Sequence, residues 1–151
     1  MKTAVDSSVL LDVFGADPAF GAASREALRQ AYDDGGLLAC DVVWAEVSAH
    51  FESEAAFEEA VGALGLEFSP VDAKAAALAG RRFRQQHEQR RGIESKGRKG
   101  APASVVAADF LVGAHALLNA DRLLARDRGF YKSCFKELRL MLPGRKRTAR
   151  R

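Results

Sequence analysis

Four acidic residues stand beside apolar segments, where an ionised carboxylate needs a specific partner. Asp109 lies within "ASVVAADFLVGAHALL" and Glu46 within "DVVWAEVSAHF". Asp6 directly follows the apolar run "KTAV", and Asp127 follows "LLA". An ionised carboxylate among apolar side chains is costly unless it is paired. Asp109 is therefore protonated, paired with a base or bound to a cation. Taken singly, each of the four acids also has the alternative of a cap, a turn or a surface position.

A cluster of these four acids would suit metal-dependent chemistry. Mutual repulsion raises the pKa values of clustered carboxylates unless a divalent cation offsets it. Hard oxygen ligands without clustered His or Cys favour Mg²⁺ or Mn²⁺ over zinc. Such a cation can hold a phosphate oxygen and lower the pKa of a bound water, which suits hydrolysis of a phosphodiester. No Ser-His-Asp arrangement is evident, so we expect no covalent intermediate.

The elements that must position these acids alternate along the chain. Short apolar runs predict strands at 2–5, 37–40, 66–71, 121–125 and 136–142. Helical patterns lie between them, and this alternation is typical of an α/β domain with a mainly parallel sheet. Ligand sites in open α/β sheets form beyond the carboxyl ends of strands. Asp6 and Asp127 are therefore expected at such an edge.

Capping residues mark where the helices should begin. Asp17, followed by Pro18, predicts a helix that ends at Gly35, and Ser53 opens another. Asp72 caps a long helix, and a Gly/Lys-rich loop at 92–102 separates it from the helix of Asp109. Asp12 is interpreted as a surface or capping group. His115 is expected to serve packing.

Positive charge is concentrated in two segments. The chain carries a net charge of +3, but residues 81–99 alone carry +6 and the tail "GRKRTARR" adds five positive charges, which leaves −8 for the rest. This layout is expected of a protein that meets a polyanion, although a solvated helix face and a disordered tail remain an alternative. The candidate phosphate-binding residues are Arg81, Arg82, Arg84, Arg90, Arg91, Lys96, Arg98 and Lys99.

Length and composition indicate an ordinary globular protein. The 151 residues fit one domain at 1–142 followed by a basic, flexible tail at 143–151. Apolar content is 48% and charged content 28%, and no apolar run reaches the roughly 20 residues of a membrane span. Two cysteines form neither a disulfide framework nor a zinc motif. We therefore expect a cytoplasmic protein.

Three blocks of the sequence resemble PIN-domain ribonucleases, and most closely the VapC-type toxins of prokaryotic toxin–antitoxin pairs. The blocks are "VDSSVLLDVF", "WAEVSAHF" and "ADFLVGAHALLNADRLLARDRGFY". The resemblance spans residues 2–142 and implies a three-layer α/β/α domain with one or two Mg²⁺ or Mn²⁺ ions. Its acids match Asp6, Glu46, Asp109 and Asp127, and Ser8 matches a polar position that orients the first acid.

The resemblance also implies an activity and partners. It implies endonucleolytic cleavage of RNA that leaves a 5′-phosphate and a 3′-hydroxyl, inhibition by a cognate antitoxin, and a homodimer. Two positions depart from the family pattern, since relatives often have Asn at position 8 and usually Thr or Ser at position 125, where this chain has Ala125. The alternatives are a non-catalytic RNA-binding module and a PIN nuclease that acts in RNA processing.

Overall fold

A single parallel sheet forms the centre of the protein. The computed structural model describes residues 1–94 and 106–144, with only the backbone described at 91–94. The strands are β1 (Lys2–Val5), β2 (Gly36–Ala39), β3 (Leu66–Phe68), β4 (Arg122–Leu124) and β5 (Leu140–Met141). Their order is β3-β2-β1-β4-β5, and every neighbouring pair is parallel. The prediction of an α/β domain with a parallel sheet is confirmed.

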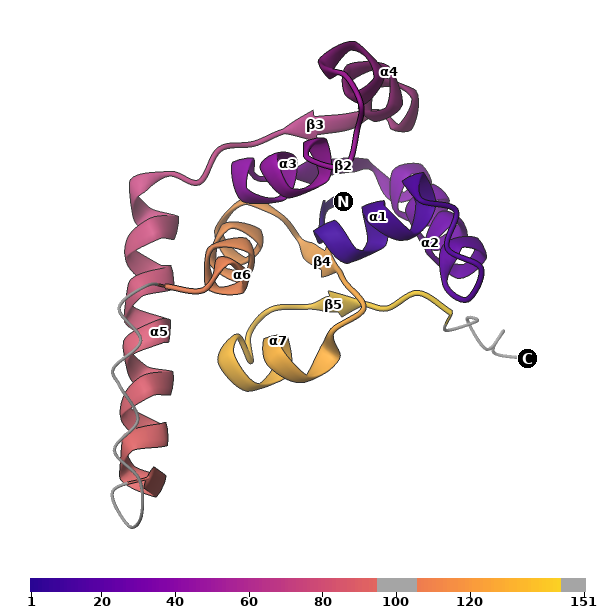
Figure 1. Cartoon of the computed structure of the whole chain (residues 1–151). Coiled ribbons are helices and arrows are strands. Elements are labelled where there is room, and N and C mark those ends of the chain that lie inside the picture. The colour runs from indigo at the N-terminus through magenta and orange to yellow at the C-terminus, as the bar shows by residue number, and fades with distance from the viewer. Residues whose placement is uncertain (95–105, 145–151) are drawn as a thin grey trace, which may run out of the picture.

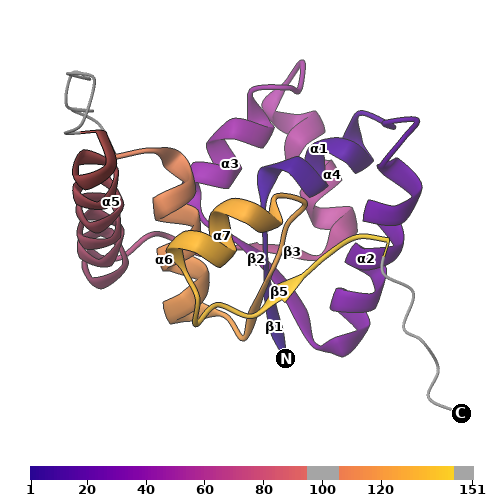
Figure 2. The same cartoon turned by 90° about the horizontal axis from the view of Figure 1, so that it is seen from below.

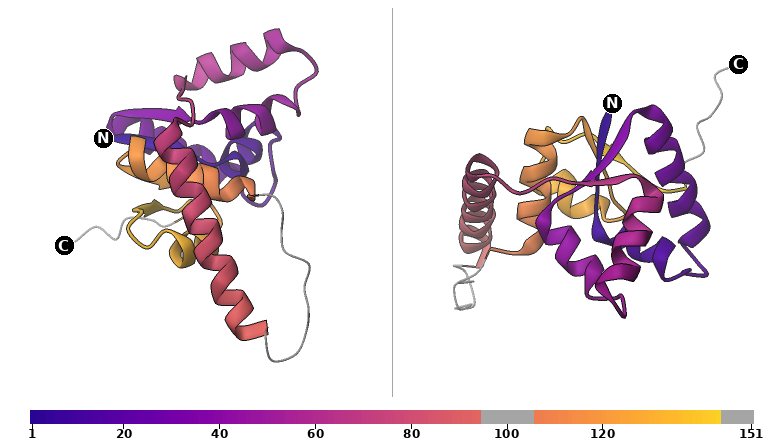
Figure 3. Two further views of the ribbon diagram at one scale, coloured as in Figure 1. Left: turned by 90° about the vertical axis from the view of Figure 1, so that its left-hand side faces the viewer. Right: turned by 90° about the horizontal axis from the view of Figure 1, so that it is seen from above.

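Seven helices surround this sheet in the described residues and complete a three-layer α/β/α arrangement. They are α1 (Ser7–Phe14), α2 (Gly21–Asp34), α3 (Asp41–Ser48), α4 (Glu54–Leu64), α5 (Ala73–Glu94), α6 (Ala108–Asn119) and α7 (Arg128–Cys134). In Figures 1 and 2, α5 and α6 lie on one side of the sheet and α2 on the other. Figure 3 shows the end of α5 extending past the rest of the domain.

The sheet order places a switch point between β1 and β4. From β1 the chain proceeds outward to β2 and β3, and then returns to the other side of β1 to form β4 and β5. Such a reversal leaves a crevice at the carboxyl ends of the two central strands, the usual ligand position in open α/β sheets. The helices α1, α3 and α7 all begin within four residues of a strand's carboxyl end and so border this crevice.

Helix ends follow the capping signals with one exception. Ser53 Oγ accepts a hydrogen bond from Ala56 N–H at 3.1 Å, and Asp72 Oδ1 accepts one from Ala75 N–H at 2.8 Å. The predicted start of α2 at Asp17 is wrong, because the helix begins at Gly21. The Asp17 carboxylate instead binds the N–H groups of the two residues that follow Pro18, which closes a separate turn before the helix.

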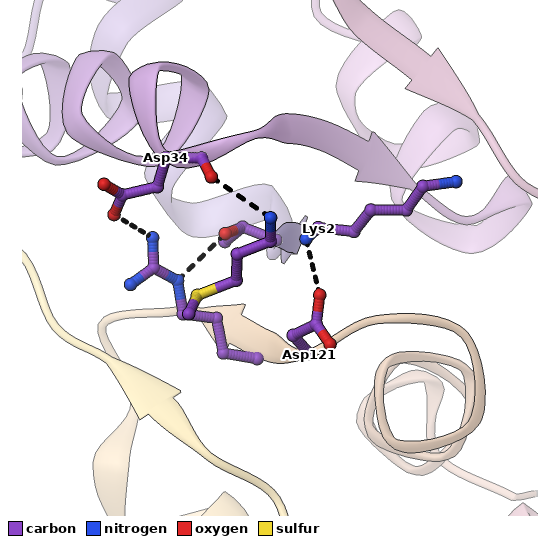
Figure 4. Close-up of polar contacts among 6 residues, drawn as sticks. Lys2, Asp34 and Asp121 are labelled. Carbon is purple, nitrogen blue, oxygen red and sulfur yellow. Dashed lines mark hydrogen bonds and ion pairs between the residues drawn. The ribbon is translucent and has the colours of Figure 1, made fainter.

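Polar contacts fasten the amino ends of β1 and β4, away from the switch-point crevice (Figure 4). Lys2 N–H donates to Asp121 Oδ2 at 2.6 Å. The Arg122 guanidinium donates to Asp34 Oδ2 at 2.7 Å and to Thr3 Oγ1 at 2.9 Å. Arg122 and Thr3 are buried, so these bonds also satisfy polar groups inside the protein. The two central strands are therefore held in register from the edge opposite the acids.

The packing role predicted for His115 agrees with its position in α6. Its side chain is buried, and its Nε2 lies 2.9 Å from Ser69 Oγ in the segment after β3.

Among the described residues, no helix is long and apolar enough to cross a membrane. Both cysteines of the chain are buried and unpaired.

Burial lowers the pKa of His115 below its ordinary value of 6.5, despite the charges of Asp41 and Asp72. The unfolded chain therefore takes up a proton that the folded protein resists, and stability is lost as the pH falls through 6.5. We expect the free energy of unfolding of the wild type to decrease more between pH 7.5 and pH 5 than that of His115→Gln. Urea titrations at several pH values measure this difference, and parallel pH profiles would contradict it.

Candidate active site

Asp6 occupies the carboxyl end of β1, at the switch point of the sheet. Its backbone N–H donates to Leu124 O of β4 at 2.9 Å, and the residue is only 7% exposed. Ser8 Oγ donates to Asp6 Oδ2 at 2.9 Å. Burial raises the pKa of Asp6, the bond from Ser8 lowers it, and the charges of Asp109 and Glu46 raise it again. Ser8 thus has the contact that an orienting residue requires.

Glu46 reaches the same region from α3. The residue is exposed, and its Oε2 accepts a hydrogen bond from Ser7 Oγ at 2.8 Å. Ser7 directly follows Asp6, so this bond joins α3 to the first turn of α1 beside the buried acid. His50, one turn further along the chain, binds the backbone carbonyl of Glu46 at 2.9 Å through its Nδ1. Its ring is thereby engaged by the backbone and does not share the Glu46 carboxylate.

The surroundings of Asp109 differ from those expected. The residue is exposed and lies in the first turn of α6, because the helix begins only at Ala108. Val106, an apolar residue that precedes it, therefore does not belong to the helix, and Val105 lies outside the described residues. Its carboxyl group is still partly screened from water, which raises its pKa, and the charges of Glu46 and Asp127 raise the pKa further.

Asp127 stands at the start of α7, after β4. It is the N-cap of the helix, and its Oδ1 accepts a hydrogen bond from Phe130 N–H at 3.3 Å. Ala125, where the family pattern has a hydroxyl, is fully buried, and its N–H donates to Met141 O of β5. The helix amino end thus orients Asp127 in this chain without a hydroxyl group at position 125.

The four acids gather at one edge of the sheet without forming a closed ligand cluster. In addition to burial, the charges of Asp109 and Glu46 raise the pKa of Asp6. In the same way, the charges of Glu46 and Asp127 raise the pKa of Asp109. Among the described residues none of the four acids forms an ion pair. In this same part of the chain, no three His, Cys, Asp or Glu side chains are close enough together to hold a metal ion.

The donor set nevertheless fits a hard divalent cation. It contains only carboxylate oxygens and hydroxyl groups, which Mg²⁺ and Mn²⁺ accept as ligands or as partners of bound water. None of the four carboxylates is paired with a Lys or Arg in the described part of the chain, and a cation would lower the repulsion that raises the pKa values of Asp6 and Asp109. The carboxylates would have to move toward one another to bind the ion directly.

Tyr131 is a buried neighbour of these acids that the sequence reading missed. Its side chain is 1% exposed, and its hydroxyl has no hydrogen-bond partner in the described structure. Burial raises its pKa, and the charges of Asp6, Asp109 and Asp127 raise it further. The hydroxyl therefore stays protonated and can donate a hydrogen bond near the carboxylates. An aromatic residue four positions after Asp127, on the same face of α7, was the available signal.

The prediction that Asp12 is a surface or capping group is wrong, because the residue is buried. Its Oδ2 accepts hydrogen bonds from Arg126 Nε at 2.9 Å and from Ser24 Oγ at 2.8 Å. The Arg126 guanidinium also lies 4.3 Å from the centre of the Phe20 ring. Arg126 immediately precedes Asp127, so this ion pair attaches the loop of the fourth acid to α1. The sequence pattern that could have predicted this burial is the position of Asp12 inside the apolar run of α1.

Replacing Arg126 with Ala should destabilise the protein by about 3 kcal/mol, because it leaves a charge on the buried Asp12 without a partner. Chemical denaturation measures the loss. The double variant Arg126→Ala, Asp12→Asn should recover most of it, since no unpaired charge remains. Arg84→Ala is the matched control, because Arg84 pairs with Glu88 only at the exposed surface. Equal losses in the two single variants would contradict the assignment.

The predicted phosphate-binding residues fall into three groups. Arg81, Arg84 and Arg90 are exposed on α5. Arg82 is engaged, because it binds both carboxylate oxygens of Glu137 and the carbonyl of Cys134, which joins α5 to α7. The remaining positions, the Arg91 side chain, Lys96, Arg98 and Lys99, lie outside the described residues, as does most of the tail at 143–151.

Comparison with known proteins identifies the fold. A family model described as the PIN domain matches residues 3–136, whereas no curated protein matches the sequence. A chain in the crystal structure of VapBC2 from Rickettsia felis, bound to a DNA fragment from its promoter, has a TM-score of 0.64 at 17% identity, over 95% of this chain and 99% of that chain.

Two further solved structures show the same fold at low identity. A chain of DNA-bound VapBC from Salmonella typhimurium has a TM-score of 0.58 at 15% identity, over 94% of this chain and 98% of that one. A chain of VapBC-1 from nontypeable Haemophilus influenzae has a TM-score of 0.54 at 14% identity, over 93% of this chain and 97% of that one. Because the family model spans most of the sequence and the folds agree, this chain belongs to the PIN domain family.

Proposed function

We propose that this protein is a metal-dependent endoribonuclease and the toxin component of a type II toxin–antitoxin system. The observation that carries the proposal is the concentration of carboxylates at the switch point of the sheet. Burial and mutual charge raise the pKa values of Asp6 and Asp109 there. Such an arrangement costs stability, and binding a divalent cation for phosphodiester hydrolysis would account for it.

Each acid has a proposed role in hydrolysis. Asp6, Glu46 and Asp109 would hold one or two Mg²⁺ or Mn²⁺ ions, directly or through water, and Asp127 would complete the set or orient the attacking water. The bound cation would neutralise charge on the phosphate and lower the pKa of the attacking water. Ser8 keeps Asp6 oriented through its hydrogen bond. Tyr131 would donate its proton in a hydrogen bond to an oxygen within this region.

The reaction adds water to phosphorus and breaks the bond between phosphorus and O3′. The 3′ oxygen leaves with a proton as a hydroxyl group, and the phosphate stays on the 5′ end of the other fragment. Exposed arginines of α5 would bind neighbouring phosphates, since Arg81, Arg84 and Arg90 lie on a helix that packs against α6. Of the three, Arg90 lines the same cavity as Asp109.

The proposed partners rest on the family and on the similar structures. Each of the three similar structures is a VapBC assembly, which supports a cognate antitoxin for this chain. An antitoxin arginine entering the carboxylate site would be a direct inhibitor. The homodimer and the cytoplasmic location remain predictions. A short open reading frame directly upstream of the gene would favour the toxin over a PIN nuclease in RNA processing.

Cleavage of total RNA by the purified, antitoxin-free protein tests the nuclease. We expect cuts with Mg²⁺ or Mn²⁺ and none with EDTA or with Asp109→Asn. Asp33→Asn is the matched control, because Asp33 is an exposed acid in the last turn of α2 next to the amino edge of the sheet. Intact RNA under all conditions, with folded protein, would instead favour a non-catalytic RNA-binding module.

A further inference from the structure

A cavity opens directly beside Asp109, between α5, α6 and α7. It has a volume of about 360 Å³. Figures 1 and 2 show α5 lying alongside α6, with α7 on the other side of α6. The cavity is lined by Phe83, Gln86, His87, Arg90, Ala107, Asp109, Phe110 and Phe130. One of the four proposed catalytic acids therefore forms part of its wall.

Aromatic rings form much of the cavity wall. Phe110 is buried, and the Phe83 and Phe130 rings meet it edge to face, with centroids 5.6 Å and 4.9 Å away. The His87 ring stacks on Phe83 with centroids 5.7 Å apart and an angle of 18° between the planes. His87, Phe83 and Phe130 are half-buried. Aromatic rings of this kind can stack against a flat heterocycle.

Polar groups stand on the rim of the same cavity. Arg90 lies four positions after Gln86 and three after His87 on α5, so the three side chains share one face of the helix. The Gln86 amide can donate and accept hydrogen bonds at the edge of a base. Arg90 is exposed and forms no ion pair among the described residues. Its charge suits a phosphate.

We propose that this cavity binds one unpaired RNA base next to the phosphodiester that is cut. The inference rests on the proposed nuclease function and adds a base-binding subsite to it. RNA-binding proteins commonly recognise single strands by stacking splayed bases on aromatic side chains and binding their edges. Here the base would stack on the His87 and Phe83 side, Gln86 would contact its edge, and Arg90 would bind an adjacent phosphate.

The position of Asp109 links base binding to cleavage. Asp109 belongs to both the cavity wall and the carboxylate site. A base in the cavity would therefore bring its own phosphate toward the acids. Arg90 lines the same cavity as Asp109. Its positive charge would attract the anionic phosphate of a bound nucleotide. The cavity would therefore select which bond is cut according to the base beside it.

Binding of hexanucleotide RNAs with a single 2-aminopurine tests the subsite. The full-length protein is titrated in EDTA, so that cleavage does not interfere, and stacking is read as quenching of the fluorescence. We expect quenching by the wild type, loss of quenching and about tenfold weaker binding for His87→Ala, and a salt dependence reduced by about one phosphate contact for Arg90→Ala. Gln89→Ala is the control, because Gln89 lines a different cavity beside Arg82.

The outcomes separate the subsite from the nuclease. Metal-dependent cutting with unchanged quenching and unchanged cleavage sites in His87→Ala would overturn the subsite and leave the nuclease intact. Quenching that is lost in His87→Ala but not in Gln89→Ala supports the base-binding cavity even if no RNA is cut. If His87→Ala weakens only binding of the antitoxin, the cavity holds a protein side chain and the inference is wrong.

Discussion

Replacing Asp6 with Asn is expected to reduce RNA cleavage about a thousandfold while leaving the metal-free protein at least as stable as the wild type. Asp6 is buried, and its burial and the neighbouring charges raise its pKa, so the ionised form is disfavoured in the fold. Asn has the same shape, carries no charge and can still accept the hydrogen bond from Ser8. Activity and stability should therefore change in opposite directions.

Single-turnover cleavage and the thermal midpoint of the EDTA-treated protein measure the two effects. Ser8→Ala provides an intermediate case, because it removes the bond that lowers the pKa of Asp6 but keeps the acid. We expect a loss of activity of about 10- to 100-fold for it. A variant Asp6→Asn that both unfolds easily and loses activity would show that Asp6 serves the fold instead of the reaction.

Adding Mg²⁺ or Mn²⁺ is expected to stabilise the protein by about 2.7 kcal/mol at a cation concentration 100 times the dissociation constant. In a protein of this size that corresponds to a rise in Tm on the order of 5–10 °C. A bound cation would offset the repulsion between carboxylates that raises the pKa values of Asp6 and Asp109. The gain should disappear in Asp6→Asn.

This stabilisation should also increase with pH. The folded-state pKa values of Asp6 and Asp109 are raised above 3.8, the value in the unfolded chain. The metal-free protein therefore loses stability as the pH rises through these folded-state pKa values, because the two carboxylates then ionise in the fold. Cations bind only the deprotonated ligands. Thermal melts with and without Mn²⁺ between pH 5 and pH 8 measure the trend. An equal gain in wild type and Asp6→Asn, or none at any pH, would refute metal binding at this site.

Local patterns in the sequence predicted most of the fold. Strand positions follow from short apolar runs, and Ser53 and Asp72 set helix starts through hydrogen bonds to backbone N–H groups three residues on. The predicted strand at 136–142 shortens to Leu140–Met141, because the preceding residues continue from α7 and bury Leu138 in a turn. Such features depend on neighbours in the chain and are readable without the structure.

What could not be predicted depends on partners distant in the sequence. Asp12 is buried only because Arg126 and Ser24 approach it from other elements. Asp109 is exposed because its helix starts later than its apolar pattern indicates. The cavity beside it needs α5, α6 and α7 together. Sequence patterns identified the acids, but the direction in which each one points is set by these tertiary contacts.

The pairing of β1 with β4 has a consequence for synthesis of the chain. Thr3 and Arg122 face each other in the sheet although they are 119 positions apart in the sequence. A ribosome releases β1, β2 and β3 long before β4, so a nascent chain holds Asp6 and Glu46 without Asp109 and Asp127. If the protein cuts RNA, activity would therefore arise only after β4 and Asp127 have been synthesised and β4 has paired with β1.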